Sequence, residues 1–216
     1  MARRTKADAQ ATRSSLLDAA EHLFQARGVS RTSLNDIAIA AGTTRGAIYW
    51  HFKDKADLFN AMLERVTLPM EAALQQTGQD ARVDPLDELR QSVFSALHRI
   101  VSDDQTRRVF EVATHKVEYV DDLMAVKTHH FNARASGVGA LQRSLEAAAA
   151  RRGVMLAVPL PVAARALHAM LVGLIHDWLL ASSDFDLLAD GTRAVDALLA
   201  GMGLPPSNLE VAAVAA

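Results

Sequence analysis

The sequence predicts an all-α protein in which a small N-terminal domain of three helices precedes a larger helical domain. Apolar residues make up 50% of the 216 residues and aromatic residues only 5%, and this Ala-rich composition favours closely packed helices over a β-sandwich. Apolar side chains recur at i, i+3, i+4 spacing along nearly the whole chain. Capping residues, Gly and Pro divide this pattern into segments of helical length. We find no internal repeat and no convincing strand.

The first helix is predicted from about Lys6 to Arg27. Thr5 and Asp8 have the spacing of a capping box, and Gly28 suits the left-handed position that ends a helix. Apolar residues fall on one face of this helix, at Leu16, Leu17, Ala20, Leu23 and Phe24.

Two short helices and a longer one follow. Ser33 and Asp36 form a second capping-box pattern before a short helix, which Gly42 ends. The next short helix is expected over residues 45–50, and a charged turn after it begins a connecting helix at about 54–76. Two short helices joined by a Gly-containing turn have the form of a helix-turn-helix.

Five more helices are predicted in the rest of the chain. Pro85 suits the first turn of a helix that runs to about Val101. The others are a helix capped by Ser102–Asp104, a long helix that follows Asp121 and Asp122 and ends near Arg152, and two apolar helices at about 162–181 and 187–202. We therefore predict a helix-turn-helix domain at 1–55, a helical domain at 77–204 and a disordered tail at 205–216.

Charge and composition narrow the class of protein. Residues 1–60 carry nine Lys or Arg against six Asp or Glu, whereas the remaining residues carry fourteen against nineteen. Because charges are screened over about 8–10 Å, a polyanion bound at the N-terminal part would be attracted by its positive charge and would be little affected by the negative charge of the rest of the chain. The lack of Cys excludes disulfides and Cys-based zinc sites. With no membrane-length apolar run and no secretory leader pattern, we expect a cytoplasmic protein without a membrane partner.

The second short helix carries side chains suited to the major groove, which is about 12 Å wide. Thr44 and Arg45 lie at its start, where side chains reach base edges. Arg45 can donate two parallel hydrogen bonds to guanine O6 and N7. Gly46 and Ala47 are small, so the helix can lie deep in the groove.

The other positions of this segment have separate expected roles. Tyr49, His51 and Lys55 can reach phosphates, which positions the helix without reading sequence. Ile48 and Phe52 are expected to face the core of the small domain. We expect Trp50 to pack between the two domains rather than to contact DNA.

Several stretches resemble the DNA-binding motif of TetR-family repressors. They are residues 31–38, Ala41-Gly42 and TRGAIYWHFKDKADLF at 44–59. The opening RRTKADAQATR (3–13) and the run TRGAIYWHF are similar to the AcrR/TtgR branch of that family, which controls multidrug efflux pumps. Weaker similarity to the ligand domain of that branch continues in TRRVFEVATHKVEY (106–119) and GLIHDWLL (173–180).

The resemblance implies a double-stranded operator DNA partner and assigns roles by position. It implies base contacts from Arg45 with Thr44, Gly46 and Asn35, and phosphate contacts from Thr32, Tyr49, His51 and Lys55. Arg3, Arg4 and Lys6 form a basic arm, which is open to two interpretations: it enters the minor groove or it follows the backbone.

The resemblance also implies a pocket for a small hydrophobic or amphiphilic effector. The expected lining residues are Val93, Phe94, Leu97, Phe110, Thr114, Leu141, His168, Leu171, Val172 and His176. Ordinary core packing is the alternative for each of them. Phe110, Thr114, Val172 and His176 replace more polar residues of the better-known relative, so the pocket should be more apolar and the identity of its ligand does not transfer.

The last two helices carry small and apolar residues that favour a homodimer. Small residues let helices approach closely, and two such helices from each chain would form a four-helix interface. The expected interface residues are Ala166, Ala169, Gly173, Leu174, Ala194, Ala197 and Leu198. A dimer would place its two reading helices one DNA turn apart, about 34–36 Å, or a multiple of it.

No enzyme motif competes with this interpretation. His129 and His130 point about 100° apart on a helix and cannot chelate one ion together. The pair His115 and Glu118 lacks the second set that a di-iron bundle needs, and there is no nucleophile elbow or phosphate loop. We expect no metal, no cofactor and no catalysis. Three hypotheses stay open: a repressor of a multidrug efflux pump, a regulator of a metabolic operon, and a helical ligand-binding protein without DNA function.

Overall fold

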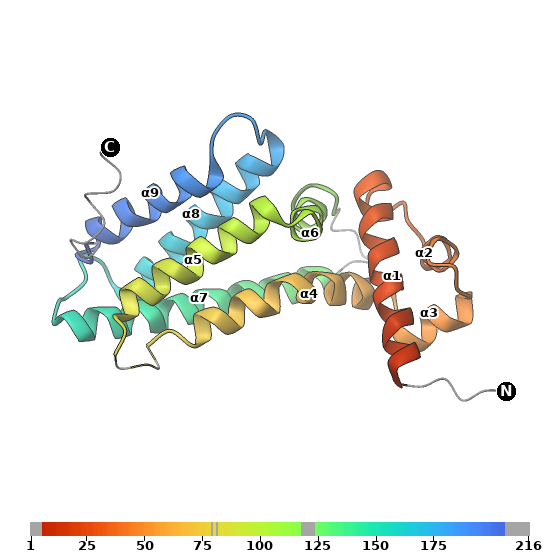
Figure 1. The fold of residues 1–216 in the computed structure, drawn as a ribbon, viewed down its shortest axis with the longest axis horizontal. Helices are drawn as coiled ribbons and strands as arrows, with labels where there is room; N and C mark the ends of the chain where they lie inside the picture. The colour runs from red at the N-terminus through yellow and green to blue at the C-terminus, as the bar shows by residue number, and fades with distance from the viewer. Residues whose placement is uncertain (1–5, 79, 81, 118–123, 206–216) are drawn as a thin grey trace. The chain divides into compact units, whose positions relative to one another are not determined.

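The computed structural model describes residues 6–205 except 79, 81 and 118–123, and all regular structure in this part of the chain is helical (Figure 1). This confirms the predicted all-α class. The helices are α1 (Lys6–Arg27), α2 (Leu34–Ala40), α3 (Arg45–His51), α4 (Lys55–Gln75), α5 (Pro85–Ser102), α6 (Asp104–His115), α7 (Met124–Arg152), α8 (Leu160–Leu180) and α9 (Leu187–Gly201). The predicted basic arm at Arg3 and Arg4, the Thr5 cap and residues 206–216 lie outside the described residues.

The chain divides into two compact units. The first contains the described residues through Thr67 together with those of Asp104–Asn132, and the second contains Leu68–Asp103 and the described residues from Ala133 onward. Thus α6 packs with the first unit, although the boundary predicted near residue 77 placed it with the second. The physical reason is the burial of apolar side chains, because Val109 and Val112 of α6 lie in the core of the first unit.

Predicted capping signals set the ends of the first three helices. Gly28 ends α1 at φ +85°, the left-handed conformation expected there. Ser33 and Asp36 form the predicted capping box on α2, with the Ser33 hydroxyl accepting from the Asp36 N–H at 3.1 Å. The Ser33 hydroxyl and backbone N–H also donate to the Asp36 carboxylate, at 2.6 and 3.0 Å, and these two hydrogen bonds hold the pKa of Asp36 below its ordinary value. Gly42 makes the turn to α3 at φ +66°.

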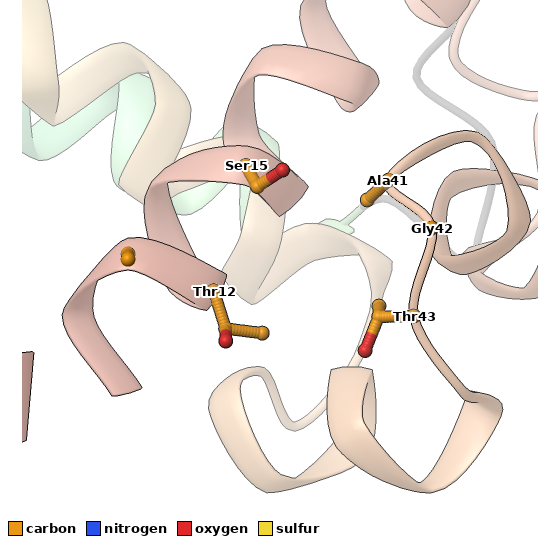
Figure 2. A pocket seen from close by; sticks show the side chains of 6 residues that line it. Thr12, Ser15, Ala41, Gly42 and Thr43 are labelled. Carbon is orange, nitrogen blue, oxygen red and sulfur yellow. The ribbon is translucent and has the colours of Figure 1, made fainter. Parts of the chain in front are cut away.

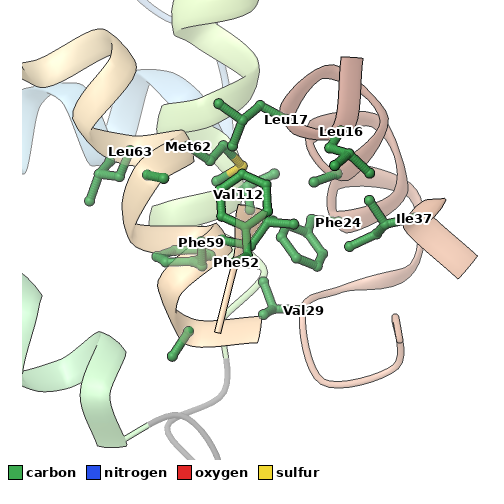
Figure 3. Packing of buried hydrophobic residues seen from close by; sticks show 14 of the residues in the cluster. Leu16, Leu17, Phe24, Val29, Ile37, Phe52, Phe59, Met62, Leu63 and Val112 are labelled. Carbon is green, nitrogen blue, oxygen red and sulfur yellow. The ribbon is translucent and has the colours of Figure 1, made fainter. Parts of the chain in front are cut away.

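One apolar core holds the first unit together (Figure 3). The rings of Phe24 on α1 and Phe59 on α4 lie 6.2 Å apart between centroids. Ile48 and Phe52, predicted to face inward, are buried beside them. Each such side chain contributes about 1.5–3 kcal/mol by leaving water, so the short helices α2 and α3 owe their stability to this core rather than to their own length.

The second unit is built from α5, α8, α9 and the parts of α4 and α7 assigned to it. Helix α9 packs on α5 and on α8. Arg90 of α5 forms a two-pronged ion pair with Asp196 of α9, at 2.7 and 2.8 Å. Gly191 lets α9 approach closely, because a Cβ there would lie 2.8 Å from Cδ1 of the buried Leu97.

Asp84 caps the N-terminus of α5 and joins it to α7. Its carboxylate accepts from the Leu86 N–H at 2.9 Å and from Arg152 at 2.8 Å. Burial opposes its charged form, but these two partners together hold the pKa of Asp84 below its ordinary value. None of the helices among the described residues is both long and apolar enough to cross a bilayer.

Candidate nucleic-acid interface

Helix α3 presents one exposed face and one buried face. Ile48 is fully buried, and the residue that ends the helix, Phe52, is buried with it. Arg45, Gly46 and Tyr49 are exposed, as the sequence predicted for the reading face. The helix is therefore fastened to the core along one side, while the other side is open to a partner.

The exposed face is led by a guanidinium that lies over an aromatic ring. The Cζ atom of Arg45 is 5.8 Å from the centroid of Tyr49, which is 49% exposed. Such a cation–π contact is worth about 0.5–1 kcal/mol at an exposed site. Arg45 forms no hydrogen bond or ion pair among the described residues, so its donors are available while the ring limits how the side chain moves.

The start of α3 is fixed by Thr44. Its hydroxyl accepts from the Ala47 N–H at 3.2 Å and so caps the helix, while the residue itself is exposed. At Gly46 a Cβ would meet only the Thr44 hydroxyl, at 3.9 Å. Asn35, exposed in the first turn of α2, is the remaining residue predicted to contact bases.

Two residues predicted to contact phosphate have other partners. Thr32 is buried, and its hydroxyl donates to the Gly28 carbonyl at 2.9 Å. The side chain is therefore bonded within this turn rather than presented at the surface. The Lys55 ammonium donates to the carbonyls of Val29, Ser30 and Thr32 at 2.8–3.1 Å. All three of its protons are therefore directed at the loop between α1 and α2.

The C-terminal end of α3 carries two rings in edge-to-face contact. His51 is half-buried, and its ring meets that of Trp50 edge to face at 4.6 Å between centroids. Trp50 is 73% exposed. The prediction that Trp50 packs between domains is wrong, because this position falls on the same open side of α3 as Gly46 rather than on the Ile48 side.

A hydroxyl-lined hollow lies beside the α2–α3 turn (Figure 2). Thr12 and Ser15 of α1 line one wall, and Gly42 and Thr43 of the turn line the other. The Thr12 hydroxyl donates to the Asp8 carbonyl at 2.9 Å, which leaves its oxygen able to accept. Sequence reasoning missed this hollow, because no spacing in the chain relates the middle of α1 to the turn.

The residues predicted to line an effector pocket belong to both units. Phe110 and Thr114 belong to the first unit, where Phe110 packs on the core and the Thr114 hydroxyl donates to the Phe110 carbonyl. The other eight belong to the second unit: Val93, Leu97 and Leu141 are buried, His168, Leu171 and His176 are half-buried, and Phe94 and Val172 are exposed. His168 lies against Gly137 of α7. Val172, half of whose surface is open, faces outward on α8.

The residues predicted for a dimer interface lie on helix faces that are at least partly open. Ala169, Gly173 and Ala197 are exposed, and Ala166, Leu174, Ala194 and Leu198 are half-buried. Spacings of seven, four and seven residues place Val162, Ala169, Gly173 and Leu180 on one line along α8, and all four are exposed. A Cβ at Gly173 would meet nothing within 4 Å.

Among the described residues no group of three His, Asp or Glu could hold a metal ion.

The family models match both parts of the chain. Residues 16–62 match the bacterial regulatory proteins of the tetR family, and residues 84–203 match the C-terminal region of MAATS-type transcriptional repressors. The HTH-type transcriptional regulator TtgR of Pseudomonas putida is 38% identical, over 96% of this chain and 99% of its own.

Solved structures agree in fold and sequence. NalD, the secondary repressor of the MexAB-OprM multidrug efflux pump in Pseudomonas aeruginosa, superposes with a TM-score of 0.81 at 34% identity, over 90% of this chain and 97% of its own. The complex of SmeT, from Stenotrophomonas maltophilia, with triclosan gives 0.81 at 32% identity, over 93% and 98%. Matches to both halves, at this identity and coverage, show that the chain belongs to the TetR family of bacterial transcriptional regulators.

Proposed function

We propose that this protein is a ligand-released transcriptional repressor that binds a palindromic operator as a homodimer and controls a multidrug efflux operon. The observation that carries the proposal is the open face of α3, where Arg45 lies over Tyr49 without a polar partner among the described residues. An exposed guanidinium of this kind can donate two hydrogen bonds to guanine O6 and N7. Such a contact discriminates against the other bases by about 1–3 kcal/mol.

Around Arg45, other exposed groups suit the DNA backbone. Tyr49 and the Thr44 hydroxyl are exposed near Arg45, and the half-buried His51 lies at the C-terminal end of α3. The hollow between α1 and the α2–α3 turn adds Ser15 and Thr43 as hydroxyl donors for a phosphate oxygen. Contacts of this kind set the register of the helix and carry no sequence information. We leave Thr32 and Lys55 out of this set because their polar groups are engaged within the loop.

Homodimerisation through α8 and α9 would supply the second reading helix. The exposed line of Val162, Ala169, Gly173 and Leu180 is apolar along the length of α8, and apolar surface of this kind is stabilised by a partner. Gly173→Glu should therefore yield monomers in sedimentation, whereas Ala150→Glu, at an exposed position of α7 outside the proposed interface, serves as the matched control. Equal dimer fractions for the two variants would contradict this interface.

Two observations support a small apolar aromatic compound as the effector: what is known of similar repressors, and the apolar side chains of the second unit. SmeT has been solved with triclosan, and the similar repressors NalD and SmeT act on multidrug efflux pumps. The second unit of this chain buries Val93, Leu97 and Leu141, side chains suited to an apolar aromatic compound of that kind. A ligand releases the operator only if it binds the non-binding state better, by several kcal/mol for near-complete release.

A footprint on DNA upstream of the chain's own gene tests the function. We expect protection of a palindrome whose two halves lie one helical turn or a multiple of it apart, with loss of protection on adding triclosan. Protection that triclosan leaves intact, but that a metabolite of the neighbouring genes removes, would point to a metabolic regulator. Absence of any salt-dependent protection would favour a ligand-binding protein without DNA function.

A further inference from the structure

Glu21 is a buried acid at the meeting point of three helices. It lies in the C-terminal half of α1 and is 1% exposed. Arg65 of α4 donates to its carboxylate. From α6, the Gln105 amide lies 3.3 and 3.4 Å from the two carboxylate oxygens, and the Arg108 Nε lies 3.7 Å from one of them. A carboxylate buried this deeply is stable only with such partners.

Helix α6 is fastened to the DNA-binding unit along its length. Beyond the contacts to Glu21, the Gln25 amide of α1 donates to Glu111 at 2.8 Å. The Val29 N–H donates to the carbonyl of Lys116, just after α6, at 3.0 Å. Together with the buried Val109 and Val112, these bonds give α6 both apolar and polar attachments to the α1 side of the unit.

The same helix is the direct continuation of a helix in the second unit. Only Asp103 separates the end of α5 from the start of α6, and its N–H still donates to the Arg99 carbonyl of α5. The covalent link from α5 to α6 is therefore one residue long. How well this link holds the DNA-binding unit depends on how firmly α6 is attached to that unit.

We propose that Glu21 is a positioning residue for operator binding: it locks α6 onto α1 and thereby fixes the DNA-binding unit to the chain that leads into the second unit. The proposal rests on the dimeric repressor proposed above. In such a dimer, both reading helices engage at once only if each is held firmly, since a loose attachment lowers the effective concentration of the second helix at its half-site. Glu21 touches no DNA in this account.

Glu21→Gln tests the proposal, because it keeps the shape of the side chain and removes its charge. Glu146→Gln is the matched control, since it makes the same change at an exposed position of α7. We expect hydrogen exchange in residues 104–116 to become about tenfold faster in Glu21→Gln and to stay unchanged in Glu146→Gln. Affinity for a full palindromic duplex should fall about tenfold, while affinity for a half-site duplex changes less than about twofold.

The outcomes separate this proposal from the proposed function. Unchanged exchange over α6, or equal losses on full and half sites, would overturn the role of Glu21. A wild-type protein that binds full and half sites equally would overturn the dimeric operator contact, and exchange over α6 would still decide whether Glu21 holds that helix. Arg108→Met removes the charged partner of Glu21 on α6 and should reproduce both effects, so a Glu21 variant that does not fold leaves the test intact.

Discussion

Lys55 offers the sharpest test of how the DNA-binding unit is held. The sequence predicted that Lys55 contacts a DNA phosphate. In the structure its ammonium donates instead to three carbonyls of the α1–α2 loop. Lys55→Met keeps the length and apolar stem of the side chain and removes the three donors. We expect a stability loss rather than a specific loss of DNA affinity.

The size of this loss follows from the geometry. A hydrogen bond to a charged group contributes about 1.5–3 kcal/mol net. The three bonds share one ammonium and the site is part-buried, so their contributions do not add fully, and water can reach some of the carbonyls left behind. We therefore expect the free energy of unfolding to fall by about 2–3 kcal/mol, near the value of one or two such bonds.

Urea unfolding followed by circular dichroism measures this loss. Lys53→Met is the control, because Lys53 is exposed and close in sequence. The Lys55 variant should unfold at a lower urea concentration with the same slope, and its salt dependence of operator binding should match that of wild type. Equal midpoints for the two variants, together with a salt slope reduced by about one unit in Lys55→Met alone, would restore Lys55 to the phosphate contacts and refute the reasoning.

Three further predictions concern packing, acid stability and fluorescence. Gly191→Ala should lower the free energy of unfolding by about 1–2 kcal/mol, because overpacking against α5 outweighs the gain in helix propensity. Gly173→Ala has open space around it, so its higher helix propensity should raise the free energy of unfolding when this is measured at concentrations that favour monomers. The pKa of Asp84 is lowered from 3.8, so its contribution is present above that value and is lost as the pH falls through the lower folded pKa; the urea midpoint of wild type should fall between about pH 5 and 3, and that of Asp84→Asn should fall less. Operator DNA should quench the emission of Trp50, and Trp50→Phe should abolish the change, because Trp178 is only 6% exposed.

Each of these has a contradicting result. A Gly191 variant as stable as wild type would show that Leu97 can move aside at no cost. Identical acid profiles for wild type and the Asp84 variant would remove the Arg152 contact from the stability of the fold. Quenching that persists without Trp50 would place the spectral change in the second unit.

Local signals in the sequence predicted most of the fold. Capping residues such as Ser33 and Thr44 and the left-handed glycines 28 and 42 act within a few residues, so their effects can be read from the chain directly. Helix bounds followed from them to within a few residues. The packing of α6 on the first unit could not be predicted in this way, because it depends on apolar contacts between segments about 80 residues apart.

The candidate site was predicted in part for the same reason. The exposed face of α3 follows from helical periodicity once Ile48 and Phe52 are assigned to the core. For Lys55 and Thr32 the sequence predicted phosphate contacts, whereas the structure has both side chains bonded to backbone carbonyls. Their spacing in the sequence does not indicate which carbonyls lie near them in the folded loop. Glu21 went unnoticed as well: an acid on a helix is usually a surface residue, and only the tertiary structure brings Arg65 and Arg108 to it.

Arg45 tests the central claim most directly. Affinities of wild type, Arg45→Ala and Arg143→Ala should be measured on the palindromic operator and on random duplex at one salt concentration; Arg143 is exposed on α7 and controls for loss of charge. If the central claim holds, Arg45→Ala binds the operator about 5- to 150-fold more weakly per half-site, with a much smaller change on random DNA and relaxed preference at one base pair. An equal loss on both duplexes, or no loss beyond that of Arg143→Ala, would contradict it.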